Sequence, residues 1–136
     1  MDISAALDFV RSHSHAVLAT RRRDGTPQLS PVTVAVDDAG LVVISTREPA
    51  YKVKNVRRDP QVSLLVLSDA FFGEWVQLEG TVDVLPLPAA MEPLVDYYRQ
   101  LSGEHPDWDD YRAAMVREQR CLLRVTVTSA GPDASG

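Results

Sequence analysis

Hydrophobic positions in this chain fall into one helical stretch at the start and then into a series of short strand-like runs. Ile3, Ala6, Leu7 and Val10 recur at steps of three and four residues, which predicts an amphipathic helix over about the first dozen residues. Short apolar or alternating runs predict six β-strands, at residues 15–20, 28–36, 41–45, 62–67, 74–85 and 121–127. The pattern therefore predicts a mainly β chain with helices inserted among its strands.

Turn residues link the first three predicted strands as successive hairpins. Asp24-Gly25 lies between the first two strands, where glycine supplies the positive φ of a tight turn, and Asp37 to Gly40 forms the next connection. Within residues 28–36, three valines at alternate positions are expected to share one face of the strand. Connections this short imply an antiparallel meander. Further along the chain, Gly80 marks a bulge in the strand 74–85.

Three further helices are predicted between the later strands. Pro49 fits the first turn of a helix whose apolar positions recur every three residues, and this helix must end before Asp59 because a proline follows. Residues 94–101 carry a second helical apolar face, and Asp107 is expected to cap a third helix. Residues 128–136 are small and polar and are expected to form a frayed tail.

Six antiparallel strands of this length are expected to close into a small barrel, since closure removes exposed edges. We therefore predict a six-stranded antiparallel split β-barrel with inserted helices, formed as one domain by residues 1–136. The side chains of a barrel this small fill its interior, so a sizeable ligand must lie outside it, in a groove. A second copy of the chain is the usual source of the second wall of such a groove, and a homodimer is expected.

Composition narrows the possible partners. The net charge of -5 argues against a nucleic-acid binder, whereas 45% hydrophobic residues suffice for a core. No apolar run approaches the roughly 20 residues that span a bilayer, so no membrane partner is expected. The single cysteine, Cys121, lies in an apolar run and is expected to be a buried structural thiol. A reduced, cytoplasmic protein is therefore expected. The three histidines lack the spacing of metal ligands, and no metal site is expected.

The segment 45–58 carries the strongest local indication of a binding site. Basic residues gather around the predicted start of a helix, where positive charge is unfavourable unless an anion neutralises it. One interpretation is a phosphate site that uses the hydroxyls of Ser45 and Thr46, backbone N–H groups near Ala50, and the ammonium of Lys52. The other is a solvated basic helix face, and spacing alone does not decide between the two.

An aromatic cluster follows the fourth predicted strand. Phe71, Phe72 and Trp75 lie close together in the sequence and could stack against a planar ring or simply pack in the core. No glycine-rich phosphate loop and no nucleophile-elbow pattern is present in the sequence. Hydrolysis is therefore not expected.

Taken together, the motifs are similar to those of a known family, the split-barrel flavin and deazaflavin proteins related to pyridoxamine phosphate oxidase. The chain most resembles the actinobacterial branch that uses the deazaflavin coenzyme F(420). The matching segments are Val17 to Thr20, Asp24 to Ser30, Lys52 to Pro60, Glu79-Gly80, and Tyr98 to Tyr111.

The resemblance implies a homodimer with two cofactor grooves at the subunit interface. In similar proteins the residue that matches Lys52 holds the phosphate, and basic or polar groups meet an anionic tail. Two departures concern Ala50, where a relative can carry a basic residue, and Pro31, which lacks an N–H donor. The cofactor-binding residues implied in this way, together with the phosphate site above, are Gln28, Ser30, Pro31, Val32, Ser45, Thr46, Ala50, Lys52, Lys54, Asn55, Arg57 and Trp75.

The function expected from the resemblance is a coenzyme F(420)-dependent oxidoreductase that transfers a hydride between the deazaflavin and a small electron-poor organic substrate. The cofactor carries the hydride chemistry, so no catalytic side chain is assigned. Two alternatives remain open: a flavoprotein of the same fold that binds FMN, and a non-catalytic protein that binds or stores coenzyme F(420).

Overall fold

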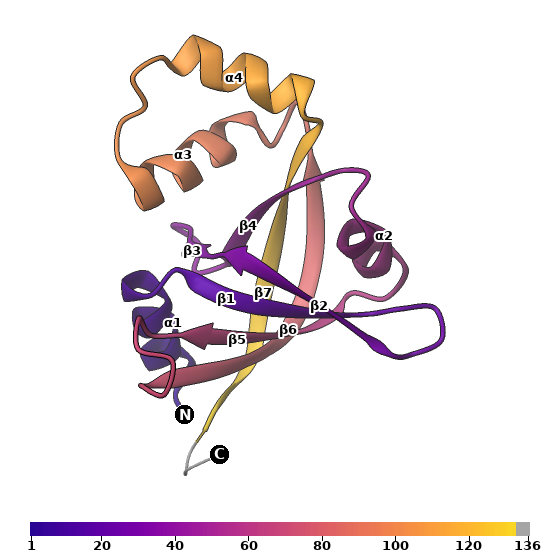
Figure 1. Cartoon of the computed structure of the whole chain (residues 1–136), viewed down its shortest axis with the longest axis vertical. Coiled ribbons are helices and arrows are strands. Elements are labelled where there is room, and N and C mark those ends of the chain that lie inside the picture. Colours follow the sequence, from indigo (N-terminus) through magenta and orange to yellow (C-terminus); the bar gives the residue numbers. More distant parts are fainter. Residues whose placement is uncertain (133–136) are drawn as a thin grey trace.

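A computed structural model describes residues 1–132 of the chain, which form four helices and seven strands (Figure 1). The predicted helices and strands are all present. In chain order the elements are α1 (Ile3–Ser12), β1 (His15–Arg21), β2 (Pro27–Thr33), β3 (Ala35–Val36), β4 (Val42–Arg47), α2 (Tyr51–Arg58), β5 (Gln61–Leu67), β6 (Trp75–Pro86), α3 (Met91–Ser102), α4 (Trp108–Arg117) and β7 (Arg120–Gly131).

All seven strands belong to one antiparallel sheet in the order β2-β1-β5-β6-β7-β4-β3. The strands at the two edges, β2 and β3, follow one another in the chain with only Val34 between them, so the sheet curls into a barrel. The expected antiparallel split barrel is confirmed, but the count of six strands is wrong. The single predicted strand 28–36 divides at Val34, whose N–H donates to the carbonyl oxygen of Ser14 at 2.8 Å instead of joining the ladder between β3 and β4.

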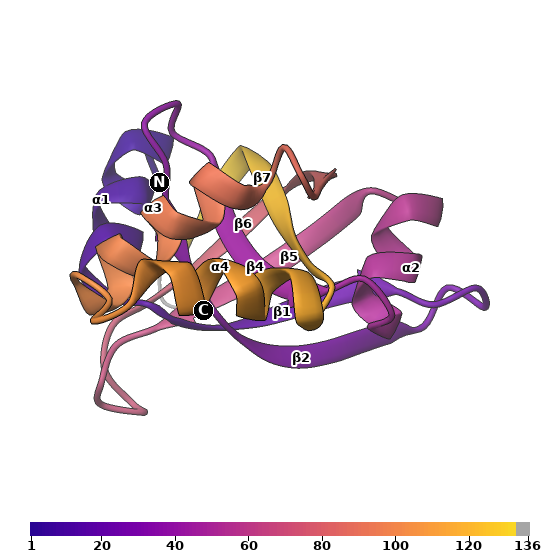
Figure 2. The ribbon, with the colours of Figure 1, turned by 90° about the horizontal axis from the view of Figure 1, so that it is seen from above.

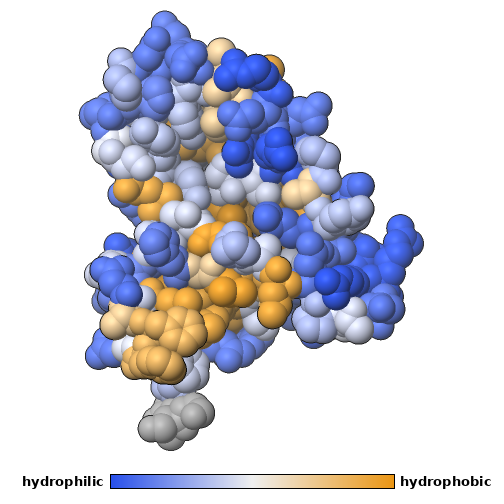
Figure 3. All heavy atoms as spheres, viewed as in Figure 1, coloured by the Kyte–Doolittle hydropathy of each residue, from blue (hydrophilic) through white to orange (hydrophobic). Residues whose placement is uncertain are grey.

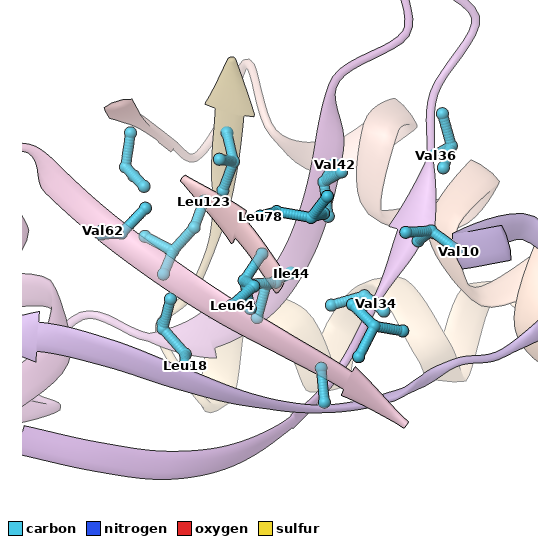
Figure 4. Packing of buried hydrophobic residues seen from close by; sticks show 14 of the residues in the cluster. Val10, Leu18, Val34, Val36, Val42, Ile44, Val62, Leu64, Leu78 and Leu123 are labelled. Atoms are coloured by element: carbon cyan, nitrogen blue, oxygen red, sulfur yellow. The ribbon is translucent and has the colours of Figure 1, made fainter. Parts of the chain in front are cut away.

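Two apolar clusters hold the fold together. The larger cluster fills the barrel, where Leu18, Ile44, Leu64 and Leu78 meet from four strands (Figure 4). The smaller cluster lies outside the barrel and packs α3 and α4 against the outer face of β4 and β7, with Leu122 buried at its base. The helix pair is therefore fixed to the strands that bear the candidate site.

The helix ends agree with most of the local predictions. The side chain of Asp107 caps α4 by accepting from the N–H of Asp110 at 3.1 Å, and α2 ends at Arg58, before Asp59, as expected. The placement of Pro49 was wrong: α2 begins at Tyr51 with Ala50 as its N-cap, so the proline precedes the helix and lies in the turn that leads to it.

The long strands β6 and β7 settle two further predictions. Their register shifts between Glu79 and Gly80, which confirms the predicted bulge. The predicted frayed tail is wrong for residues 128–131, because β7 continues to Gly131 and pairs there with Gln77 of β6. Residues 133–136 lie outside the described part of the chain.

Cys121 is buried as predicted, and its burial raises the pKa of the thiol to about 11. Among residues 1–132, no helix is long and apolar enough to cross a bilayer.

Candidate functional site

A groove with a volume of about 960 Å³ runs along the outside of the barrel. Its floor consists of residues from β1, β2 and β4, and the start of α2 forms one end. The α3–α4 pair forms the opposite wall with Tyr97, Tyr98, Tyr111 and Met115. Six of the twelve predicted site residues line this groove: Pro31, Val32, Ser45, Thr46, Ala50 and Lys52.

Three basic residues, Arg47, Lys52 and Arg120, line the groove near the start of α2. Partial burial lowers the pKa of Lys52, and the nearby charge of Arg120 lowers it further. Glu118 holds the Arg120 guanidinium through hydrogen bonds of 3.0 and 2.8 Å from Nε and Nη2, but no carboxylate of residues 1–132 forms an ion pair with Lys52. The positive charge of Lys52 is thus only poorly compensated within the protein.

The backbone around Ala50 supplies fewer free donors than the sequence predicted. The N–H of Ala50 donates to the carbonyl oxygen of Arg47 at 3.0 Å and is used in the turn before the helix. The N–H groups of Tyr51 and Lys52 lie in the first turn of α2, where no helical carbonyl precedes them. These two N–H groups are the backbone donors that this end of the helix can offer to an anion.

A second hollow, of about 820 Å³, lies on the far side of α2 next to the β1–β2 loop. Figures 1 and 2 show this loop and α2 together at the side of the barrel away from α1. Four basic residues and a single acid, Asp24, line the hollow, together with Tyr51. The basic residues are Arg22, Arg23, Lys54 and Arg58, and the predicted site residues found here are Gln28, Lys54 and Asn55.

Asn55 is buried and connects the two sides of this hollow. Its side-chain amide donates to the Oε1 of Gln28 at 2.8 Å and to the hydroxyl of Thr20 at 3.1 Å. Its Oδ1 accepts from the guanidinium of Arg58 at 3.1 Å. Since every polar atom of the Asn55 side chain is engaged, this residue orients Gln28 and Arg58 and has little capacity left for a ligand.

The other three predicted residues line neither hollow. Ser30 is half-buried on β2, where it pairs with Leu18 of β1. The guanidinium of Arg57 forms a two-pronged ion pair with Glu48 at 2.6 and 3.2 Å. Trp75 begins β6 and pairs with Leu67, whose side chain lines the groove. The roles predicted for these three residues stay predictions.

Several groove residues were not identified from the sequence. Arg120 lies opposite Arg47 across the β4–β7 ladder, a pairing between segments more than seventy residues apart, which no local pattern reveals. Tyr98 and Tyr111 entered the sequence analysis only as the ends of a segment that matches the family, although both line the groove. The sequence did contain one indication of these groove residues, because three of its four tyrosines lie in α3 and α4.

An apolar area borders the open side of the groove. The half-buried Val17 and Leu65 pair across β1 and β5 on the outer face of the barrel, and Leu29 of β2 is 64% exposed. Phe71 and Phe72, in the β5–β6 loop, are 76% and 96% exposed. Figure 3 shows the area as an apolar patch over β1, β5 and this loop. We call these five residues the outer apolar face.

Comparison with solved structures supports the fold. A conserved hypothetical protein of Mycobacterium tuberculosis is 27% identical, with a TM-score of 0.77, over 100% of this chain and 92% of that chain. An F(420) reductase is 22% identical, with a TM-score of 0.67, over 87% of this chain and 89% of that chain. The heme storage protein HutZ of Vibrio cholerae is 13% identical, with a TM-score of 0.71, over 96% and 94% of the two chains. The same fold thus occurs in a protein named as an enzyme and in one named as a storage protein.

The sequence itself identifies the family. The profile of the pyridoxamine 5'-phosphate oxidase family matches residues 4–131, which is nearly the whole chain and includes every strand of the barrel. The resemblance stated from the motifs is therefore confirmed at the level of the family. The chain belongs to the pyridoxamine 5'-phosphate oxidase family of split β-barrels.

Proposed function

We propose that this protein binds coenzyme F(420) in the groove and serves as a reductase that transfers a hydride to a small electron-poor organic molecule. The observation that carries the proposal is the continuity of positive charge around α2. Ala50 and Lys52 line the groove, while Tyr51 and Lys54, adjacent in the sequence, line the second hollow. A ligand whose phosphate lies at Lys52 can therefore extend an anionic tail into the second hollow.

The residues present fit such a cofactor. The pKa of Lys52 is lowered by burial and by Arg120, so an approaching phosphate relieves an electrostatic cost that the protein carries by itself. Ser45 and Thr46 add hydroxyls beside the start of α2, where the helix dipole favours an anion. The second hollow adds Arg22, Arg23, Lys54 and Arg58, which suit a chain of carboxylates.

When bound, the deazaflavin supplies a carbon that donates or accepts a hydride, which makes it a two-electron carrier. The residues of the chain itself bind this cofactor and orient it in the groove. Lys52 and Arg120 hold the phosphate end, and Pro31, which pairs with Val17 on the outer face, provides an apolar surface for a ring. Tyr97 stiffens the opposite wall, because its hydroxyl donates to the carbonyl oxygen of Thr33 at 2.8 Å and so ties α3 to β2.

Two alternatives use the same groove. FMN ends at its phosphate and would leave the basic residues of the second hollow without a ligand group. A non-catalytic F(420) carrier would use both hollows, and the fold likeness to a heme storage protein makes this second function worth testing. Turnover of the bound cofactor with a substrate panel separates the carrier from the reductase.

The deciding experiment titrates the purified protein with FMN and with coenzyme F(420) carrying short and long glutamate tails, followed by fluorescence. We expect tighter binding of F(420), with an affinity that rises with tail length and falls with salt. The double variant R23Q/K54Q should lose about two- to thirtyfold in affinity for the long tail only, since each exposed charge contributes up to about 1 kcal/mol. The variant D38N, remote from both hollows, is the matched control. Preference for FMN, or affinity independent of the tail, would contradict the proposal.

We further propose that the protein forms a homodimer through the outer apolar face. Exposed aromatic pairs such as Phe71 and Phe72, which meet edge to face with ring centroids 5.0 Å apart, are uncommon on isolated monomers. This face borders the open side of the groove, so a second copy there would supply the missing wall.

The dimer is tested by sedimentation velocity. The wild-type protein should sediment at twice 15.0 kDa, and L65R should sediment as a folded monomer because an arginine within this face would leave a buried charge unpaired in the dimer. Gln61, exposed on the same strand and outside the apolar face, provides the control variant Q61R, which should remain dimeric. A monomeric wild-type protein, or a dimer in both variants, would rule out this interface.

A further inference from the structure

The α3–α4 wall presents three tyrosines to the groove, and two of their hydroxyls are already engaged. Tyr97 donates to the carbonyl oxygen of Thr33, and Tyr111 donates to the carbonyl oxygen of Leu94, both at 2.8 Å. The hydroxyl of Tyr98 has no hydrogen-bond partner among residues 1–132, although its ring is half-buried and lines the groove. Tyr98 is thus the tyrosine of this wall that can still donate to a ligand.

The ring of Tyr98 is held in place by other aromatic side chains. Its centroid lies 5.0 Å from His105, 5.1 Å from Tyr111 and 5.7 Å from Trp108. The contact with Trp108 is edge to face, which is a favourable geometry for aromatic pairs. A ring packed on several sides loses little further freedom when a ligand binds, so its hydroxyl is pre-organised.

The cluster is in turn fixed by polar contacts on its far side. Glu104 accepts from the indole Nε1 of Trp108 at 3.0 Å and from the Nε of Arg99 at 2.6 Å. The Arg99 guanidinium lies 4.9 Å from the centre of a Trp108 ring. These contacts fix the position of Trp108 in the groove wall. The Trp108 ring in turn packs against the ring of Tyr98.

We propose that Tyr98 contacts the substrate, and that it selects flat conjugated molecules that carry a carbonyl oxygen. The inference rests on the proposed function and deepens it. The substrate packs against the Tyr98 ring and the side chain of Met115, while the Tyr98 hydroxyl donates to the carbonyl oxygen. Since an O–H group donates only to an acceptor, a flat molecule without a carbonyl oxygen or any other hydrogen-bond acceptor gains the packing but not the hydrogen bond.

The hydrogen bond strengthens as the reaction proceeds. A hydride from the reduced cofactor adds to the electron-poor end of the conjugated system, and the π-electron pair moves onto the carbonyl oxygen. The substrate is reduced by two electrons and the cofactor is oxidised by two. The resulting enolate or phenolate oxygen carries the negative charge that Tyr98 stabilises by donation, and water then supplies the proton.

Menadione and the dye 10-methylacridinium separate the two contributions, since both are flat hydride acceptors and only menadione has atoms that accept a hydrogen bond. For Tyr98→Phe we expect a fall of about tenfold in kcat/KM for menadione and less than about twofold for the dye. Tyr98→Ala should impair both acceptors, because packing is also lost. The affinity for the cofactor should change little in either variant. Val116→Ala, on the exposed side of α4, should alter neither acceptor.

A second measurement needs no bound cofactor. In a Trp75→Phe background, Trp108 is the remaining tryptophan, and a quinone bound near Tyr98 should quench its fluorescence. The dissociation constant of menadione should rise severalfold when Tyr98→Phe is added. The inference about Tyr98 would be overturned if Tyr98→Phe lowered kcat/KM equally for both acceptors. It would also be overturned if the dissociation constant of menadione did not change. Failure of the wild-type protein to bind F(420), with Tyr98-dependent quenching intact, would overturn the proposed cofactor and leave Tyr98 as a ligand contact.

Discussion

Replacement of Lys52 by methionine is expected to weaken binding of a phosphate-bearing cofactor by about 1.5–3 kcal/mol, the scale of a hydrogen bond to a charged group. This corresponds to a dissociation constant about ten to a hundred times higher. Methionine keeps the unbranched stem of the side chain and removes the charge, so the groove should keep its shape. Fluorescence titration of the variant with F(420) and with FMN measures the effect.

The same variant should not be less stable than the wild type in the absence of ligand. Burial and the charge of Arg120 lower the pKa of Lys52 below its usual 10.5, so the folded state disfavours the charged form that prevails at neutral pH. Removal of the charge should raise the melting temperature at pH 7, and this gain should shrink as the pH approaches 10.5. Lys54→Met, on the other side of α2, is the control and should leave FMN affinity unchanged. A less stable variant with normal affinity would make Lys52 a structural residue.

Replacement of Gly80 by valine is expected to lower the free energy of unfolding by about 3 kcal/mol, at the upper end of the cost of overpacking. A β-carbon at this position would lie 2.3 Å from the carbonyl oxygen of Thr126 and 3.0 Å from the Cγ1 of Val125. The first of these neighbours is backbone in the adjacent strand β7, so the two long strands would have to separate at the bulge.

Urea denaturation of the ligand-free protein measures this loss. Thr81→Val introduces a β-branched apolar residue at the next position without adding a β-carbon and should change the unfolding free energy by less than about 1 kcal/mol. If Gly80→Val were as stable as Thr81→Val, the close approach of β6 and β7 at the bulge would be incorrect.

Local signals were sufficient for most of the fold. The positive φ of Gly25 (85°), the bulge at Gly80 and the end of α2 before Asp59 all follow from the conformational limits of one or two residues. The break at Val34 could not be predicted, because its side chain obeys the alternation of a continuous strand and is buried in the barrel as expected. What changes there is the partner strand, which depends on contacts distant in the sequence.

The same distinction applies to the candidate site. Ser45, Thr46, Ala50 and Lys52 were predicted together because they lie in one short segment, and the structure brings all four to one groove. Arg120 reaches the groove only because β7 pairs with β4 in a particular register. Its position is a property of the sheet rather than of any stretch of sequence.

The order of the strands has a consequence for synthesis on the ribosome. The last strand among residues 1–132, β7, lies between β6 and β4 and pairs with both. Until β7 has been translated and has left the exit tunnel, β4 and the short β3 have no neighbour that joins them to β6. The nascent chain can form the β1–β2 and β5–β6 hairpins early, but the groove cannot exist before almost the entire barrel has emerged. The apolar strands that emerge earlier are therefore expected to stay exposed to chaperones until β7 has left the tunnel.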